Sequence, residues 1–224
     1  MLDNAGWFAL TSKHARFAEG QGSARRYEPD VTVFSAMTDD SPDSWSDLGE
    51  LIGTGNRAVL FRAKKVIAPP GWRVVFGGRG HQMILIGSLP DVEIPATLRP
   101  LSNGDVPAML ELVELSKPGP FAPRTIELGG YLGIFEDDRL LAMAGRRIAV
   151  DGFTEISAVC THPDARRRGL AGIVTKAVAM SLLDEGITPF LHVAETNVGA
   201  FHVYERLGFV PRLFTHFVAV ERTE

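Results

Sequence analysis

The sequence predicts an α/β fold, in which strands and helices alternate along the chain. Two observations support this class. Segments with the alternation or the apolar runs of β-strands are followed by segments in which apolar residues recur at helical spacing. Of the 224 residues, 45% are hydrophobic and 22% are charged, which is the composition of a globular protein with a sizeable core.

Three strands and one short helix are predicted in the first half of the chain. The strands are residues 57–62, 73–76 and 82–86. Either Asp43 or Ser44 caps the helix, ahead of Trp45. Residues 77–80 include three glycines, but no Lys-Ser or Lys-Thr pair follows them, so we expect a hairpin turn and not a phosphate-binding loop.

Prolines at positions 90, 95 and 100 interrupt a short polar segment. Because repeated proline disrupts both helices and central strands, we place a boundary near residue 95. Residues 1–95 are then an N-terminal α/β subdomain, and residues 96–224 are the second domain. The sequence leaves two roles open for the subdomain: one wall of a binding pocket, or a degenerate second copy of the fold that follows it.

The elements predicted after residue 96 are a helix, a three-stranded meander, a helix, a strand, a helix and a strand. Asp105 caps the first helix, and Gly186 ends the second. Turns at Asp137–Asp138 and Asp151–Gly152 separate the strands of the meander. The predicted strands are residues 131–135, 140–150, 153–161, 190–194 and 215–220.

The most informative segment is the turn that joins the third meander strand to the following helix. It is rich in Arg and Gly and leads directly into an amphipathic run that begins at Leu170. Such a turn directs several backbone N–H groups and the positive end of a helix dipole at one point, which suits a pyrophosphate. The predicted donors are the amides of residues 167–172, where Gly169 and Gly172 allow close approach.

Two motifs resemble those of the GNAT superfamily of N-acetyltransferases. Arg166-x-x-Gly169-x-Ala171 resembles its acyl-CoA-binding signature, R/Q-x-x-G-x-G/A. Residues 197–209, N-V-G-A-F-H-V-Y-E-R-L-G-F, resemble its signature N-x-x-A-x-x-x-Y-x-x-x-G-F. Over roughly residues 96–220, the order of elements also matches the fold of that superfamily, a mixed sheet flanked by helices.

The resemblance implies that acetyl-CoA is the cosubstrate and that no metal takes part. Main-chain groups of Val159, Cys160 and Thr161 are then expected to hold the pantetheine arm, where their strand splays from its neighbour. Asn197 either caps its helix or binds the cofactor through water. The other predicted cofactor contacts are Arg166, Arg167, Arg168, Gly169, Leu170, Ala171 and Gly172.

Tyr204 and Glu155 are the predicted catalytic residues. A phenol can protonate the departing thiolate, and the resemblance supports this role for Tyr204. Glu155 lies among apolar residues on the third meander strand, and the resemblance supports it as a base that acts through water. Each residue also has a structural alternative. Tyr204 could be a core tyrosine whose hydroxyl is hydrogen-bonded within the protein, and Glu155 could form a salt bridge with Arg146 or Arg147.

Cys160 is the only cysteine, which excludes an intrachain disulfide and a cysteine-based metal cluster. Alternation along the strand places Val159 on the face of Glu155 and Cys160 on the opposite face. No histidine is evidently paired with Cys160. We therefore expect no covalent intermediate on this thiol, but direct transfer from acetyl-CoA to a primary amine in a ternary complex.

Composition restricts the partners further. The net charge of −4 argues against nucleic-acid binding. No apolar run approaches the roughly 20 residues needed to cross a bilayer, and the N-terminus lacks a secretory signal, so we expect a cytoplasmic protein with no membrane partner. The sequence ranks no acceptor amine above another, and it leaves open whether the chain forms a homodimer.

Two other functions stay open at this point. One is a non-catalytic acyl-CoA-binding or regulatory domain of the same fold, which needs neither Tyr204 nor Glu155. The other is a protein-interaction module whose arginine run at 166–168 meets an acidic partner. The second alternative predicts no affinity for coenzyme A.

Overall fold

A computed structural model describes residues 1–223, which form one eleven-stranded sheet and five α-helices packed on it. The strand order is β1-β2-β3-β4-β11-β5-β10-β9-β8-β7-β6. The strands are β1 (Ala18–Glu19), β2 (Ala24–Tyr27), β3 (Phe34–Met37), β4 (Arg57–Arg62), β5 (Trp72–Leu85), β6 (Leu98–Pro100), β7 (Leu132–Glu136), β8 (Arg139–Val150), β9 (Phe153–Thr161), β10 (Thr188–Ala194) and β11 (Phe209–Arg222). The helices are α1 (Ala5–Leu10), α2 (Pro42–Ile52), α3 (Val106–Ser116), α4 (Leu170–Asp184) and α5 (Val198–Arg206).

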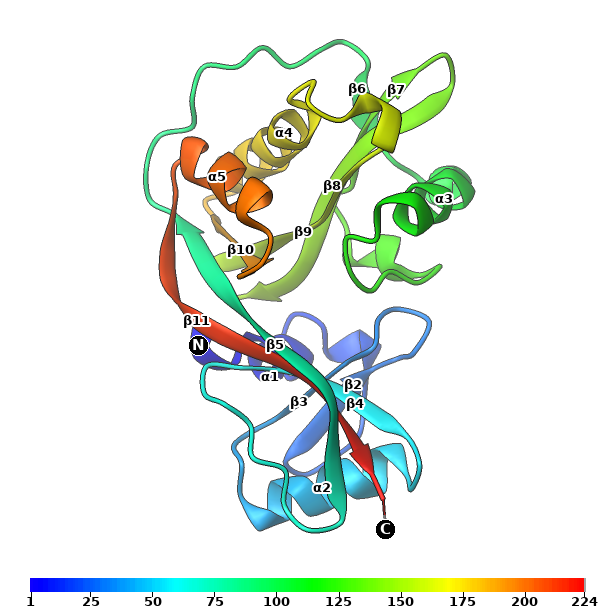
Figure 1. Ribbon diagram of the computed structural model, residues 1–224, viewed down its shortest axis with the longest axis vertical. Helices are drawn as coiled ribbons and strands as arrows, with labels where there is room; N and C mark the ends of the chain where they lie inside the picture. The colour runs from blue at the N-terminus through cyan, green and yellow to red at the C-terminus, as the bar shows by residue number, and fades with distance from the viewer. Residues whose placement is uncertain (224) are drawn as a thin grey trace.

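The sheet is mixed, as predicted, because β3–β4 and β9–β10 pair in parallel while the other neighbours are antiparallel. Two long strands, β5 and β11, pair along their length and connect the two halves of the molecule (Figure 1). One half contains β1–β4, α1 and α2, and the other contains β6–β10 and the remaining helices. The boundary predicted near residue 95 lies in the connection between β5 and β6.

Each half has its own hydrophobic core. Val174, Val178 and Leu182 recur at helical spacing on α4 and are fully buried against Ile156 and Leu191 of the sheet. In the first half, a second cluster joins α2 to the sheet; it includes Trp45, Leu48, Ile52, Leu60 and Val218. No helix among residues 1–223 has both the length and the apolar run needed to cross a bilayer.

The turns of the meander form as predicted. Asp137 and Asp138 adopt φ of 48° and 62°, and Gly152 adopts φ of 76°, which suits tight hairpins. The helix predicted ahead of Trp45 is α2, but Ser41 caps it and not Asp43 or Ser44: the Ser41 side chain accepts from the Ser44 amide at 3.3 Å. Pro42 takes the first helical position, where its missing N–H costs nothing.

The hairpin turn predicted at residues 77–80 is wrong, because this stretch lies inside the continuous strand β5. The glycines make room for partners on neighbouring strands. A Cβ on Gly78 would lie 2.4 Å from the ring of Phe217, and a Cβ on Gly80 would lie 2.6 Å from the Val193 carbonyl oxygen. Here glycine marks a close approach between strands and not a reversal of the chain.

The alternation predicted along residues 153–161 is also wrong beyond Ser157. Ala158 adopts φ of 53°, and β8 pairs with β9 at Gly145–Ser157 and next at Met143–Cys160, so Ala158 and Val159 together face one residue. This β-bulge shifts the side-chain order by one. Val159 therefore packs with Ile156 in the cluster under α4, and Cys160 packs in the cluster under α3.

Candidate active site

The turn before α4 presents a row of unused amide donors. Arg167 and Gly169 adopt φ of 65° and 78°, which curls the backbone into the start of the helix. Within residues 1–223, the amides of residues 167–171 donate no hydrogen bond to the protein, whereas the Gly172 amide donates to the Gly169 carbonyl at 3.0 Å. Five adjacent donors at a helix N-terminus form a site for a phosphate group.

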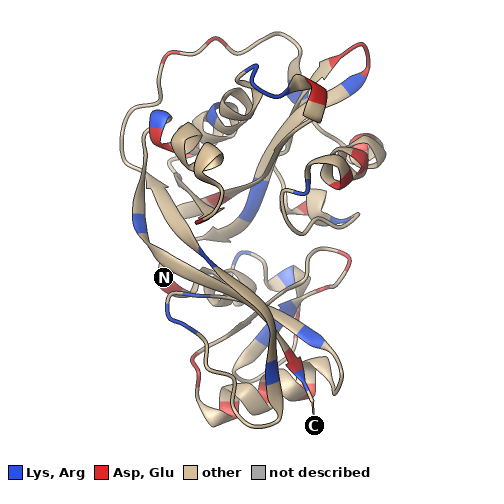
Figure 2. Cartoon of the chain, viewed as in Figure 1, with Lys and Arg blue, Asp and Glu red and all other residues tan. Residues whose placement is uncertain are grey.

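The same turn lines a groove of about 820 Å³, which α5 and the segment after β5 border through Arg206 and Pro90. In Figure 2 the turn is coloured as Lys and Arg. Arg166 and Arg167 line the groove without a charged partner among the described residues, whereas Arg168 donates to Glu136 at 2.9 Å. The groove therefore combines apolar walls with a positive end, as an acyl-CoA with its phosphates would need.

The strands β9 and β10 part in front of this groove. Their parallel pairing ends at Ile156 and Leu191, so the edge of β9 that faces β10 is unpaired from Ser157 onward. The predicted pantetheine contacts Val159, Cys160 and Thr161 lie on this stretch and line a second cavity of about 600 Å³. An extended, amide-bearing chain can add to such an edge.

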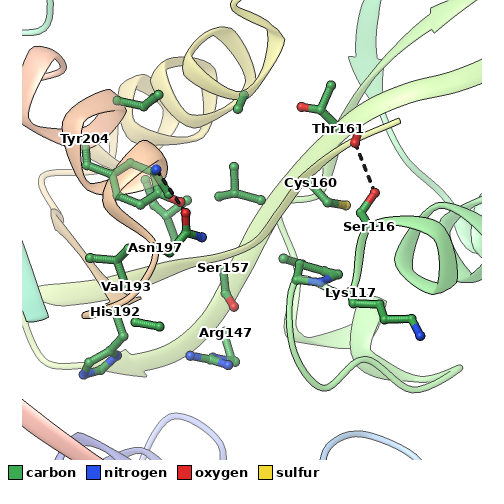
Figure 3. Close-up of a pocket in the computed structure, with 18 of the residues that line it drawn as sticks. Ser116, Lys117, Arg147, Ser157, Cys160, Thr161, His192, Val193, Asn197 and Tyr204 are labelled. Carbon is green, nitrogen blue, oxygen red and sulfur yellow. Dashed lines mark hydrogen bonds between the residues drawn. The ribbon is translucent and has the colours of Figure 1, made fainter. Parts of the chain in front are cut away.

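The two cavities share the residues Thr161, Arg166, Ala171 and Val203, so they form one continuous cleft. Tyr204 and Asn197 lie on the α5 side of this cleft, and Ser116 and Lys117 lie on the other side of β9 (Figure 3). The Asn197 side chain accepts from the Ala200 amide at 3.2 Å, so it caps α5. Burial raises the pKa of Tyr204, which keeps its phenol protonated.

Glu155 lies behind the wall of the cleft, and its carboxylate is 0% exposed. It accepts from Arg147 Nε at 2.8 Å and Nη2 at 2.5 Å, and from His192 Nδ1 at 2.7 Å. Burial alone would raise the pKa of Glu155, but the charges and hydrogen bonds of Arg147 and His192 lower it to about 2. The predicted partner Arg147 is thus present, and the role of Glu155 as a base stays a prediction.

His192 lines the cleft, but both nitrogens of its ring are engaged. Its Nε2 lies 3.2 Å from Gln82 Nε2, and the same amide group donates to the Leu2 carbonyl at 3.0 Å. An amide nitrogen can only donate, so His192 Nε2 is the acceptor and Nδ1 carries the proton toward Glu155. The network engages both ring nitrogens of His192, so neither is free to act on a substrate.

The N-terminal half supports this end of the cleft. The guanidinium carbon of Arg147 lies 4.8 Å from the ring centroid of Phe34 and 5.4 Å from that of Phe61. The Phe61 ring also lies 5.0 Å from the ring of His192. The segment after α3 is tied to the same half, because Thr125 Oγ1 donates to the Val31 carbonyl at 2.6 Å.

Sequence reasoning missed the contributions of Gln82, Phe34 and Phe61. Each comes from a strand more than 60 residues away from the residue that it contacts, and a hydrophobic strand pattern alone gives no sign of such a contact. Cys160 is buried, and burial raises the pKa of its thiol to about 12, so little thiolate forms at neutral pH. Within the described residues, no three or more His, Cys, Asp or Glu side chains are grouped so that they could hold a metal ion.

Comparisons with known proteins agree with this arrangement. The family model described as FR47-like protein matches residues 131–218. The chain is 32% identical to a GNAT-family protein of known structure from Novosphingobium aromaticivorans, with a TM-score of 0.91 over 100% of this chain and 99% of that one. No curated protein matches the sequence.

A second solved structure shows the same fold at lower similarity. It is a GCN5-related N-acetyltransferase from Kribbella flavida, 20% identical, with a TM-score of 0.66 over 96% of this chain and 93% of that one. The full-length match to the Novosphingobium protein, the free amides before α4 and the parting of β9 from β10 lead to one family. The chain belongs to the GNAT superfamily of N-acetyltransferases.

Proposed function

We propose that the protein transfers an acetyl group from acetyl-CoA to a primary amine, directly and within a ternary complex. The observation that carries this proposal is the row of free amides at residues 167–171, which opens into a cleft that continues to Tyr204. A pyrophosphate at the turn leaves the thioester end of the cofactor free to follow the unpaired edge of β9.

Bound acetyl-CoA supplies the thioester carbonyl, whose C–S bond breaks as the amine nitrogen forms the new C–N bond. Tyr204 gives its hydroxyl proton to the sulfur, and the proton that leaves the amine passes to water and returns to the phenol. Glu155 acts as a positioning residue in this proposal. Its two oxygens hold Arg147 and His192, and a carboxylate with so low a pKa is a weak base.

The proposal is tested by thermal unfolding with acetyl-CoA and by an assay of free thiol with a panel of amines. Acetyl-CoA at 100 times its Kd should stabilise the folded protein by about 2.7 kcal/mol. Tyr204→Phe should retain this stabilisation and lose about 10²- to 10⁴-fold in turnover, because only the acid is removed. If acetyl-CoA does not stabilise the protein, the proposal is overturned. If Tyr204→Phe keeps full turnover, Tyr204 is not the general acid.

A further inference from the structure

The acceptor end of the cleft is positively charged. The charged side chains that line the 600 Å³ cavity are Lys117, Arg147 and Arg166, and no Asp or Glu lines it among the described residues. Glu155, the nearest carboxylate on β9, lies behind Arg147 with both oxygens occupied. A polyamine or a second ammonium group would meet like charges in this cavity, so the wall disfavours such acceptors.

Arg147 has donors left over. Its Nε and Nη2 bind Glu155, but across residues 1–223 no group accepts a hydrogen bond from Nη1. The side chain is 11% exposed, and that exposure is into the cleft that it lines. Glu155 and the rings of Phe34 and Phe61 fix its orientation, so the remaining donors are pre-organised for a planar anion.

A second unused donor lies beside Arg147. The Tyr131 hydroxyl is buried without a hydrogen-bond partner in the described chain, and the residue is 3% exposed. Burial raises the pKa of Tyr131, and the neighbouring Arg147 charge opposes this increase. Gly145 leaves the space for the Tyr131 ring, because a Cβ there would lie 2.4 Å from it. Tyr131 is not among the residues that line the cavity, so its hydroxyl is not counted among the groups that can reach an acceptor.

Arg147 and Ser157 lie between His192 and Lys117 at the same end of the cavity (Figure 3). The Ser157 hydroxyl also has no partner in the part of the chain that the structure describes, and it points toward Arg147 in this view. The acceptor end thus combines the fixed cation of Arg147, the second cation of Lys117 and the hydroxyl of Ser157. These are the groups that recognise a carboxylate.

We infer that the acceptor amine also carries a carboxylate, which Arg147 binds through its free Nη1. This inference rests on the proposed function. Lys117 lines the cavity and adds a second positive charge; its ammonium nitrogen also lies 3.9 Å from Glu114 Oε1, an exposed pair with little energy. The positive wall also disfavours an ammonium ion, so it favours the neutral amine that can attack the thioester. The acceptor class is therefore amino acids and related amino carboxylates.

Matched pairs of acceptors test this inference without altering the enzyme. Glycine, β-alanine and phenylalanine are each compared with their own carboxamides, with release of thiol from acetyl-CoA as the readout. A hydrogen bond to a charged group is worth about 1.5–3 kcal/mol, so kcat/KM should favour the best acid over its amide at least about tenfold. Amides that react as well as every acid would overturn the inference.

A double variant tests Arg147 itself. Arg147→Gln alone leaves Glu155 as an unpaired buried charge, so Arg147→Gln is combined with Glu155→Gln to keep the site neutral. In this double variant, kcat/KM for each acid divided by kcat/KM for its carboxamide should fall toward one. Arg57→Gln removes an exposed arginine of the first half and should leave the ratio unchanged. A double variant that folds and keeps the full preference for acids would overturn the role of Arg147.

Failure of this inference is distinguishable from failure of the proposed function. If acetyl-CoA supports turnover but acids and amides react equally, only the inference about the acceptor fails. If no amine reacts, the acceptor end is still tested by thermal unfolding with coenzyme A and N-acetylated products. An N-acetylamino acid that stabilises the protein more than its amide supports the inference, and equal stabilisation overturns it.

Discussion

Glu155 is a buried charge that holds two other side chains in place. It forms three hydrogen bonds with Arg147 and His192, and its own side chain is 0% exposed. Removing one member of such a network leaves its partners desolvated and unpaired, which costs more than the pair gains by forming. The position therefore governs stability as well as the shape of the acceptor end.

Glu155→Gln should lower the free energy of unfolding by about 3–5 kcal/mol, because Arg147 keeps its charge and loses its partner. Urea denaturation measures this change. The control is Glu185→Gln, which breaks the exposed ion pair with Arg146 and should cost less than about 1 kcal/mol. Equal losses in the two variants would contradict the assignment of Glu155 as a buried structural charge.

The low pKa of Glu155 also predicts how stability depends on pH. The folded value of about 2 lies below the ordinary 4.5, so the unfolded chain binds the proton more readily. The stabilisation is complete above about pH 4.5 and is lost as the pH falls toward about 2. Between about pH 7 and about pH 3, the free energy of unfolding should fall less in Glu155→Gln than in the unaltered protein. Urea denaturation at the two pH values measures this difference. Equal losses in the two proteins would show that a group other than Glu155 causes this dependence on pH.

At the scale of elements, the turn before α4 depends on a left-handed glycine. Gly169→Ala meets no atom within 4 Å, but φ of 78° strains a residue with a Cβ by about 1–2 kcal/mol. Relief of this strain reorients the free amides, so the Kd of acetyl-CoA should rise at least about tenfold, as loss of one charged hydrogen bond would produce. Isothermal calorimetry measures the change.

The matched control lies at the other end of the same helix. Gly186 has φ of 73° and also meets no atom within 4 Å, so Gly186→Ala carries similar strain away from the turn. Both variants should lose similar stability, but only Gly169→Ala should bind acetyl-CoA more weakly. Equal affinities in the two variants would show that the turn does not hold the cofactor.

The elements also show what could be predicted from the sequence. The meander, α4 and α5 were found because hydrophobic period and turn residues are local signals, as with Gly152 and Asn197. The continuity of β5 was missed because it depends on Phe217, 139 residues from Gly78. The bulge at Ala158 was missed because its position is set by pairing with β8.

At the scale of the whole molecule, the sheet should make the two halves unfold together. Trp7 and Trp45 lie in the first half, and Trp72 at the start of β5 packs against Trp45 in the core of that half, whereas the candidate cleft lies in the second half. Tryptophan fluorescence and far-UV circular dichroism should therefore give coincident transitions. Acetyl-CoA should raise both midpoints equally, although no tryptophan lines the cleft proposed for it. Separate transitions would support independent domains on either side of residue 95.

The site shows the same dependence on long-range contacts. The turn at residues 166–169 and Tyr204 lie within short motifs, so their position beside one cleft could be predicted from the sequence, whereas their roles stay predictions. The acceptor end could not be predicted from the sequence, because Phe34 and Phe61 of the other half fix the orientation of Arg147 on β8. Side chains that meet only in the folded molecule leave no spacing to detect.

The position of β11 has a consequence for synthesis. This strand follows all the other described elements in sequence, yet it lies between β4 and β5. During translation, the first half emerges early with the facing edges of β4 and β5 unpaired, and these edges stay open until residues 209–222 have left the ribosome. A nascent chain that stalls before residue 209 should thus be a target for chaperones and proteases, and emergence of β11 should end that vulnerability.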